Sequence, residues 1–159
     1  MANYKDIKGF NVQNIDGDPP NPIVGDMYYN TAAGQGALYY NTTGTYNTAS
    51  GNAALRLNTT GSYNTGTGNR ALDANTEGGN NTAVGHYAGG LNTTGDANVF
   101  IGYQAGYNSS YATSDNKLVI ANSNTTSPLV DGDFSDATLK VNGSLNVTGS
   151  MTMGVNSTI

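Results

Sequence analysis

The sequence predicts an all-β protein: a parallel β-roll, or β-solenoid, of 17-residue repeats, forming an intertwined trimer with a C-terminal triple-stranded β-stalk. Three observations predict this fold. The central part of the chain repeats without a gap, the content of aliphatic residues is low, and apolar and polar residues alternate near the C-terminus.

The content of core-forming residues is below that of an ordinary globular domain. Leu, Ile, Val and Phe together make 27 of 159 residues. Ordering the backbone costs about 1–2 kcal/mol per residue, so a monomer with so little aliphatic surface would be poorly stable. Disorder is one alternative, but it normally accompanies high net charge and few aromatics, whereas this chain has a net charge of −5 and 11 tyrosines. Stacked repeats, with apolar burial supplied by partner chains, fit this composition better.

Several classes of protein are disfavoured by composition. Lys and Arg number only six, which argues against binding nucleic acid, because displacing counterions from phosphate requires cationic charge. The absence of Cys excludes a disulfide framework and thiolate chemistry. The N-terminus has no apolar signal-peptide core, and no apolar run is long enough to span a membrane. We therefore expect neither a nucleic acid nor a membrane as partner.

The repeats fill residues 30–108. Four units of 17 residues begin at Asn41, Asn58, Asn75 and Asn92, and a degenerate unit that begins at Asn30 precedes them. When the units are aligned, four columns hold the same residue in every unit: Gly44, Gly61, Gly78 and Gly95; Gly51, Gly68, Gly85 and Gly102; Ala54, Ala71, Ala88 and Ala105; Asn47, Asn64, Asn81 and Asn98. Agreement at so many columns indicates one structural unit repeated along the chain.

Each unit suits a single β-coil. It is short for two helices and a turn, and the Gly and Asn within it weaken helices. Two short strands and two tight turns are expected per coil, because Gly and Asn accept the positive φ of tight corners. Five coils about 4.8 Å apart would stack to a height of about 24 Å. Alternation sets Thr82 and Val84 on one face and Ala83 on the other, and residues 99–101 follow the same pattern, so one face fills the coil and the other can meet a neighbour.

Two segments of the repeats, residues 80–85 (NNTAVG) and 97–102 (ANVFIG), resemble the head repeats of trimeric autotransporter adhesins. The resemblance implies a left-handed parallel β-roll assembled as a trimer. The period of the present chain is longer than that of those heads.

Other segments resemble bacteriophage proteins. The NTTGSYNTxxG units, followed by residues 100–106 (FIGYQAG) and 116–122 (NKLVIAN), are similar to tail-fibre and virion proteins. Residues 3–9 (NYKDIKG) and 25–31 (GDMYYNT) resemble the starts of structural proteins of phages of marine bacteria. Together these resemblances imply a structural protein of a virion.

We therefore expect a trimeric virion fibre or appendage of a bacteriophage, assembled in the host cytoplasm, that presents a host-attachment surface. Its partners would be two further copies of itself, other virion proteins, and a glycan or protein of the host surface. The alternative is a bacterial surface adhesin or an extracellular filament subunit, located at the cell surface or outside the cell. The sequence shows neither a signal peptide nor a membrane-anchor barrel, so the virion is preferred, with the chain either a short complete fibre or a fragment of one.

The two ends of the chain differ from the repeats. Residues 1–29 are rich in Pro and Gly and predict an extended arm that attaches the fibre to other virion proteins, although a loosely tied terminus is the alternative. Residues 109–136 predict a connector with a short strand at 117–121. Residues 137–159 predict a strand with one apolar face, which three chains wrapped about an axis would bury as in the triple β-stalks of phage fibres. Its apolar residues occupy odd positions: Leu139, Val141, Leu145, Val147, Met151, Met153 and Val155.

The sequence offers little catalytic chemistry, and we predict no enzyme. His86, the one histidine, stands in a column that Asn52, Asn69 and Tyr103 fill in other units, which indicates a surface or packing role. The acids of the repeats, Asp73, Glu77 and Asp96, lie in different columns and form no predicted pair. We therefore predict no catalytic residue, no cofactor and no metal ligand.

Two acidic pairs have a spacing that could serve calcium: Asp16 with Asp18, and Asp131 with Asp133. Neither pair continues into the twelve-residue loop that ends on a distal Glu. Solvated turns are therefore the favoured interpretation, with calcium left open.

Tyrosines are the best candidates for binding. Tyr87, Tyr103, Tyr107 and Tyr111 cluster toward the C-terminal coils, and aromatic faces with a polar tip suit sugars and protein surfaces alike. The alternative is that tyrosines stack as ladders over the coil edges. Host-surface binding through these four residues is thus an expectation for the structure to examine.

Overall fold

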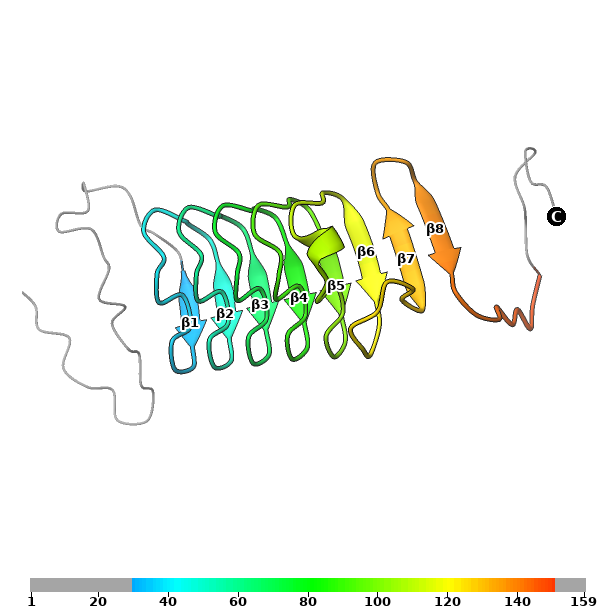
Figure 1. Ribbon diagram of the computed structural model, residues 1–159, viewed down its shortest axis with the longest axis horizontal. Helices are drawn as coiled ribbons and strands as arrows, with labels where there is room; N and C mark the ends of the chain where they lie inside the picture. Colours follow the sequence, from blue (N-terminus) through cyan, green and yellow to red (C-terminus); the bar gives the residue numbers. More distant parts are fainter. Residues whose placement is uncertain (1–29, 151–159) are drawn as a thin grey trace, which may run out of the picture.

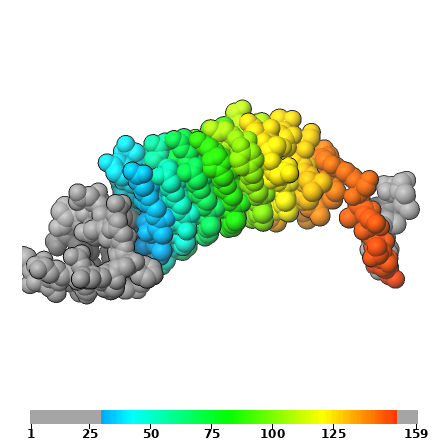
Figure 2. Space-filling view, turned by 90° about the horizontal axis from the view of Figure 1, so that it is seen from below, coloured from blue at the N-terminus to red at the C-terminus, as the bar shows by residue number. Residues whose placement is uncertain are grey.

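The computed structural model describes residues 30–150, which form an elongated all-β solenoid (Figure 1). Its strands are β1 (Thr31–Ala33), β2 (Thr48–Ser50), β3 (Thr65–Thr67), β4 (Thr82–Val84), β5 (Val99–Ile101), β6 (Lys117–Ile120), β7 (Val130–Asp133) and β8 (Thr138–Val141), with one 3-10 turn, η1 (Ser109–Tyr111). They make one sheet in chain order, parallel from β1 to β6 and antiparallel from β6 to β8. The coils lie as bands across a rod (Figure 2).

The β-solenoid predicted from the repeats is confirmed. Thr31 lies beside Thr48, and Thr48 beside Thr65, so each strand pairs with the residues one repeat later. The degenerate first unit takes part in this register, since β1 begins directly after Asn30. No described residue belongs to a helix that could cross a membrane.

The prediction of two strands per coil is wrong, because each coil has a single strand of three residues and is otherwise built of turns. The cause is the density of positive φ angles. In the second coil Tyr46, Gly51, Ala53 and Leu55 have φ values of 59°, 139°, 54° and 51°. From Tyr46 to Leu55 a residue with positive φ follows at every second to fifth position, which leaves room in that stretch for β2 alone.

Close stacking of the backbone explains the column of Gly51, Gly68, Gly85 and Gly102. A Cβ atom on Gly68, which has a φ of 131°, would lie 2.5 Å from the carbonyl oxygen of Gly85. The column that contains Gly61 is equally tight, since a Cβ there would lie 2.4 Å from the oxygen of Gly78. Both columns are therefore places where successive coils meet backbone to backbone.

In the interior of the rod a large residue always packs beside a small one, and the two positions swap roles along the chain. Leu38, Leu55 and Leu72 are fully buried and pack beside small strand residues such as Ala49 and Gly66. In the last coils the order is reversed: Phe100 is the large strand residue, and the leucine positions become Gly89 and Gly106. A Cβ on Gly106 would lie 2.2 Å from Cδ1 of Phe100, so the ring occupies the volume that a leucine takes in earlier coils.

The C-terminal part departs from the predicted segments. The strand expected at 117–121 is β6, and it extends the parallel sheet, with Leu118 beside Val99, rather than lying in a separate connector. A hairpin of β7 and β8 then closes the sheet. Of the predicted stalk, Leu139 and Val141 lie in β8, while residues 142–150 contain no strand. The triple-stranded stalk stays a prediction, and its residues 151–159, the arm 1–29 and Asp16 with Asp18 lie outside the described residues.

Candidate binding surfaces

Two ladders of buried asparagines run along the rod and account for most of its buried polar side chains. In the first ladder each Oδ1 accepts a hydrogen bond from the backbone N–H of the asparagine one coil later; its members are Asn30, Asn47, Asn64, Asn81 and Asn98. In the second ladder each Nδ2 donates to the Oδ1 of the asparagine one coil earlier; its members are Asn41, Asn58, Asn75 and Asn92. Both ladders also donate to the carbonyls of the glycine column that contains Gly61. These asparagines are therefore structural.

The ladder position also bears on glycosylation. Asn58 and Asn92 belong to Asn-x-Thr sequons, but their side chains are fully buried and their Nδ2 atoms are engaged in the second ladder. These sequons cannot accept a glycan in the folded protein.

Replacing Asn64 by Ala is expected to lower the free energy of unfolding by about 2–3 kcal/mol, because the buried N–H of Asn81 loses its acceptor at 2.9 Å. The matched control is Asn69→Ala in the same coil, whose exposed side chain makes one bond of 3.1 Å to Asn52 and should cost at most about 0.5 kcal/mol. Urea unfolding followed by circular dichroism measures both values. Equal losses for the two variants would contradict the role assigned to the buried ladder.

Three of the four candidate tyrosines belong to one cluster of rings, and Tyr111 lies apart from it. Tyr87 packs against Tyr107 with ring centroids 4.8 Å apart. His86 contacts Tyr87 edge to face at 4.4 Å and stacks on the half-exposed Tyr103 at 5.4 Å, so it joins Tyr103 to the other two tyrosines. Tyr111 is only 9% exposed and meets Phe100 edge to face, so it plugs the end of the core and is not part of an exposed aromatic surface. His86 thus has the packing contact that its column indicated.

The other aromatic column is a ladder. Tyr46 and Tyr63 are exposed and stack with ring centroids 5.0 Å apart and an interplanar angle of 5°. This arrangement matches the ladder alternative rather than a pocket.

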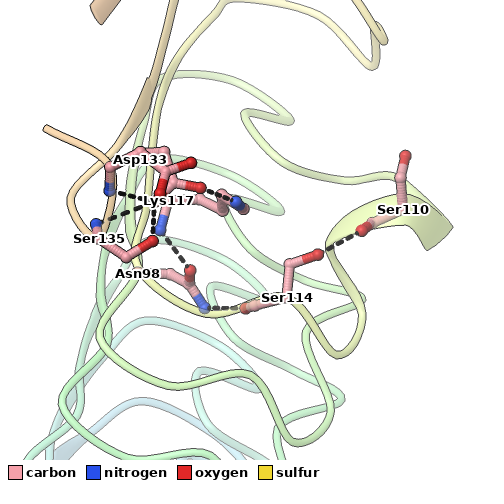
Figure 3. Close-up of polar contacts among 7 residues, drawn as sticks. Asn98, Ser110, Ser114, Lys117, Asp133 and Ser135 are labelled. Atoms are coloured by element: carbon pink, nitrogen blue, oxygen red, sulfur yellow. Dashed lines mark hydrogen bonds and ion pairs between the residues drawn. The ribbon is translucent and has the colours of Figure 1, made fainter. Parts of the chain in front are cut away.

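The pair Asp131 and Asp133 lies in β7, so the expected solvated turn is wrong for these two residues. Asp133 forms an ion pair with Lys117 of β6 and accepts the backbone N–H of Ser135 at 2.9 Å. Figure 3 shows how this pair continues the first asparagine ladder, since the backbone N–H of Lys117 donates to Oδ1 of Asn98 at 2.8 Å. No group of three His, Cys, Asp or Glu side chains within residues 30–150 is placed to hold a metal ion.

The hydrogen bond from Lys117, together with that from Ser135, holds the pKa of Asp133 well below its usual range. A carboxylate with a depressed pKa in the folded state adds stability above the unfolded value of 3.8, and this contribution is lost as the pH falls. We expect Asp133→Asn to melt below the unmodified protein at pH 7, and the difference to shrink steadily as the pH drops from about 4 toward 2. A difference that is the same at pH 7 and pH 2 would show that the ion pair does not contribute.

A polar groove of about 470 Å³ lies beside this pair, between η1 and the β7–β8 hairpin. Ser110, Tyr111, Asp131, Asp136 and Lys140 are among its lining residues. Burial raises the pKa of the Tyr111 hydroxyl, and the charge of Asp131 raises it further, so the phenol keeps its proton at neutral pH and can donate a hydrogen bond. The sequence did not predict this groove.

The outer face of the parallel sheet is the second open surface. Its two outward columns are Thr31, Thr48, Thr65, Thr82, Val99 and Leu118, and Ala33, Ser50, Thr67, Val84, Ile101 and Ile120. Both columns change from small and polar residues to apolar ones toward the C-terminus, and Val84 and Ile101 are 43% and 40% exposed.

Comparison of the chain with protein-family models, with curated proteins and with solved structures gave no match.

Proposed function

We propose that the chain is a structural subunit of a bacteriophage virion fibre or appendage, that it is a homotrimer, and that it presents a host-attachment surface. Its role is mechanical and adhesive, without catalysis. The observation that carries the proposal is the apolar end of the outer sheet face, which is open in a single chain.

The open apolar residues are too many to be incidental. Val84 and Ile101 lie on the outer sheet face, and further along the chain other large apolar side chains are more than two-fifths exposed: Leu129, Phe134, Leu139, Leu145 and Val147. Large apolar side chains exposed in such number are typical of an interaction surface. Symmetric association with two further copies covers this surface and supplies the burial that the composition lacks.

The solenoid supports a display role. Each coil contacts its neighbours through backbone hydrogen bonds that recur every 17 residues. The N–H of Thr48 donates to the carbonyl of Asn64 at 2.8 Å, and that of Thr65 donates to the carbonyl of Asn81 at the same distance. Such a stack is stiff along its axis and carries short turns on its sides, which vary without disturbing the ladder. A rigid rod with variable turns suits attachment at a distance from a particle.

The test of the assembly is a pair of charge variants. Ile101→Asp places a charge on the apolar sheet face and is expected to convert the trimer to a folded monomer of 16.4 kDa in sedimentation velocity. Thr60→Asp is the control, because its column already carries an acid at Glu77 one coil later, and it should remain a trimer. An Ile101→Asp variant that stays trimeric would refute the sheet face as the interface.

The attachment role has its own test. Fluorescently labelled trimer is expected to bind cells of the host bacterium in flow cytometry and to compete with the phage for adsorption. A protein found instead on the surface of the bacterium that encodes it would establish the adhesin or filament alternative.

A further inference from the structure

The polar groove lies where the interior of the solenoid comes to its C-terminal end. The inward column of the sheet runs from Ala83 to Phe100 and Val119, and continues to Asp131 of β7 and Lys140 of β8. Side chains that face each other across neighbouring strands lie on the same face. The last two strands thus set a carboxylate and an ammonium group where earlier coils bury apolar atoms.

Tyr111 closes the groove on the side of the core. The residue is only 9% exposed, and no described residue forms a hydrogen bond with its hydroxyl. The hydroxyl is nevertheless not among the enclosed polar atoms without a partner, so it is open to the groove that the residue lines. A nearly buried donor of this kind is directed at whatever occupies the groove.

Asp131 is the second group whose hydrogen-bonding capacity is unused. Asp133, two residues along the same strand, is saturated by Lys117 and Ser135, whereas no described residue hydrogen-bonds the carboxylate of Asp131. Lys140 stands opposite Asp131 in the strand register, but the two do not form an ion pair. The groove therefore offers a strong acceptor, a phenolic donor and an ammonium donor from three different elements.

These groups select a class of ligand. An apolar chain would leave the buried Tyr111 hydroxyl and the half-buried Asp131 carboxylate without hydrogen-bond partners, which is unfavourable. A bound anion would meet three carboxylates against two ammonium groups, those of Asp131, Asp133, Asp136, Lys117 and Lys140. A neutral polyhydroxylated molecule suits the groove, because hydroxyls donate to a carboxylate and accept from a phenol or an ammonium group. The volume of about 470 Å³ accommodates a small ligand of this kind.

We propose that this groove binds a neutral sugar residue, with Asp131 accepting hydrogen bonds from sugar hydroxyls and with Tyr111 and Lys140 donating to sugar oxygens. This inference rests on the proposed attachment function and names the ligand class as a neutral glycan of the host surface. The competing explanation is a purely protective cap, since inward-pointing charges near an edge strand also prevent association of sheets.

The experiment is a titration of the full chain with glucose, galactose, mannose and N-acetylglucosamine, followed by saturation-transfer NMR, with N-acetylneuraminic acid as the anionic comparison. We expect saturable binding of at least one neutral sugar and none of the acid. Asp131→Asn and Tyr111→Phe should each weaken that binding by about tenfold, the effect of losing a hydrogen bond to a charged or nearly buried group. Glu77→Gln, which removes the same charge from an exposed turn outside the groove, should bind as the unmodified protein does.

Circular dichroism of each variant separates loss of the site from loss of the fold. Tyr111→Phe keeps the ring that packs against Phe100, so its melting temperature should stay close to that of the unmodified protein. Absence of binding by all four sugars, or unchanged binding by both folded variants, would overturn the proposal and favour the protective cap. The fibre proposal is tested separately, by the mass of the oligomer and by binding to cells. A trimer that binds cells would therefore support that proposal whether or not the groove binds a sugar.

Discussion

Replacing Phe100 by Ala is expected to lower the free energy of unfolding by about 3–5 kcal/mol, because Phe100 is the largest fully buried side chain within residues 30–150. The ring is fully buried and fills the last coils between Gly89 and Gly106. Gly89 and Gly106, which contact the ring, have no side chains that could fill the space. Urea unfolding at one fixed protein concentration, followed by circular dichroism, measures the loss.

A compensating change tests the exchange of large and small residues directly. Gly106→Leu alone should also be destabilising, because a Cβ there would lie 2.2 Å from the ring of Phe100. The double variant Phe100→Ala with Gly106→Leu recreates the pairing of Ala49 with Leu55, and Leu55 already adopts a φ of 51°. It should therefore be more stable than either single variant. If the losses of unfolding free energy of the two single variants simply added in the double variant, Phe100 and Gly106 would not share one volume.

Replacing Gly68 by Ala is expected to cost at least about 3 kcal/mol, the second large effect. The residue combines a φ of 131°, which side chains rarely adopt, with a Cβ position 2.5 Å from the backbone oxygen of Gly85. Because a backbone atom cannot move aside without separating two coils, the strain cannot be relieved locally. Thermal and urea unfolding measure the loss.

The control for Gly68 is Gly36, which also has a positive φ, of 70°, but no atom within 4 Å of its Cβ position. Its column carries Ala53 one coil later, with a φ of 54°. Gly36→Ala should therefore cost no more than about 1 kcal/mol. Equal losses at Gly36 and Gly68 would show that φ alone matters, and that the contact between coils does not.

The register of the solenoid could be predicted from the sequence because every coil uses the same hydrogen bonds. The asparagine and glycine columns are places where one backbone meets the next, so few residue types fit and the repeat is visible. Alternation in the strand, with Ala83 inward and Thr82 and Val84 outward, follows from the same logic and is confirmed by their burial.

The number of strands per coil could not be predicted, because it depends on left-handed residues of unexpected types. Leu55, Arg70 and Tyr87 all have φ values between 51° and 57°, a conformation that sequence rules assign to Gly, Asn or Asp. The backbone hydrogen bonds between neighbouring coils hold these residues in place and offset the strain of their positive φ angles. The exchange at Phe100, in contrast, is visible in the sequence, since the leucine column turns to glycine in the same coils where the strand gains a large ring.

The groove could not be predicted because it depends on how the repeat ends. After Asn92 the spacing of equivalent hydrogen bonds grows from 17 to 19 residues: the hydroxyl of Thr76 donates to the carbonyl of Thr93, whereas that of Thr93 donates to the carbonyl of Ala112. The chain then reverses into an antiparallel hairpin, which brings Asp131 opposite Val119. A pattern based on a fixed period carries no information about either event.

The mass of the purified chain in solution tests the central claim most directly. Light scattering at several concentrations, with far-ultraviolet circular dichroism on the same samples, is expected to give a β-rich particle close to three times 16.4 kDa. The mass should not fall on moderate dilution, since the apolar face would be buried between copies. A folded β-rich monomer of 16.4 kDa at every concentration would contradict the trimeric fibre.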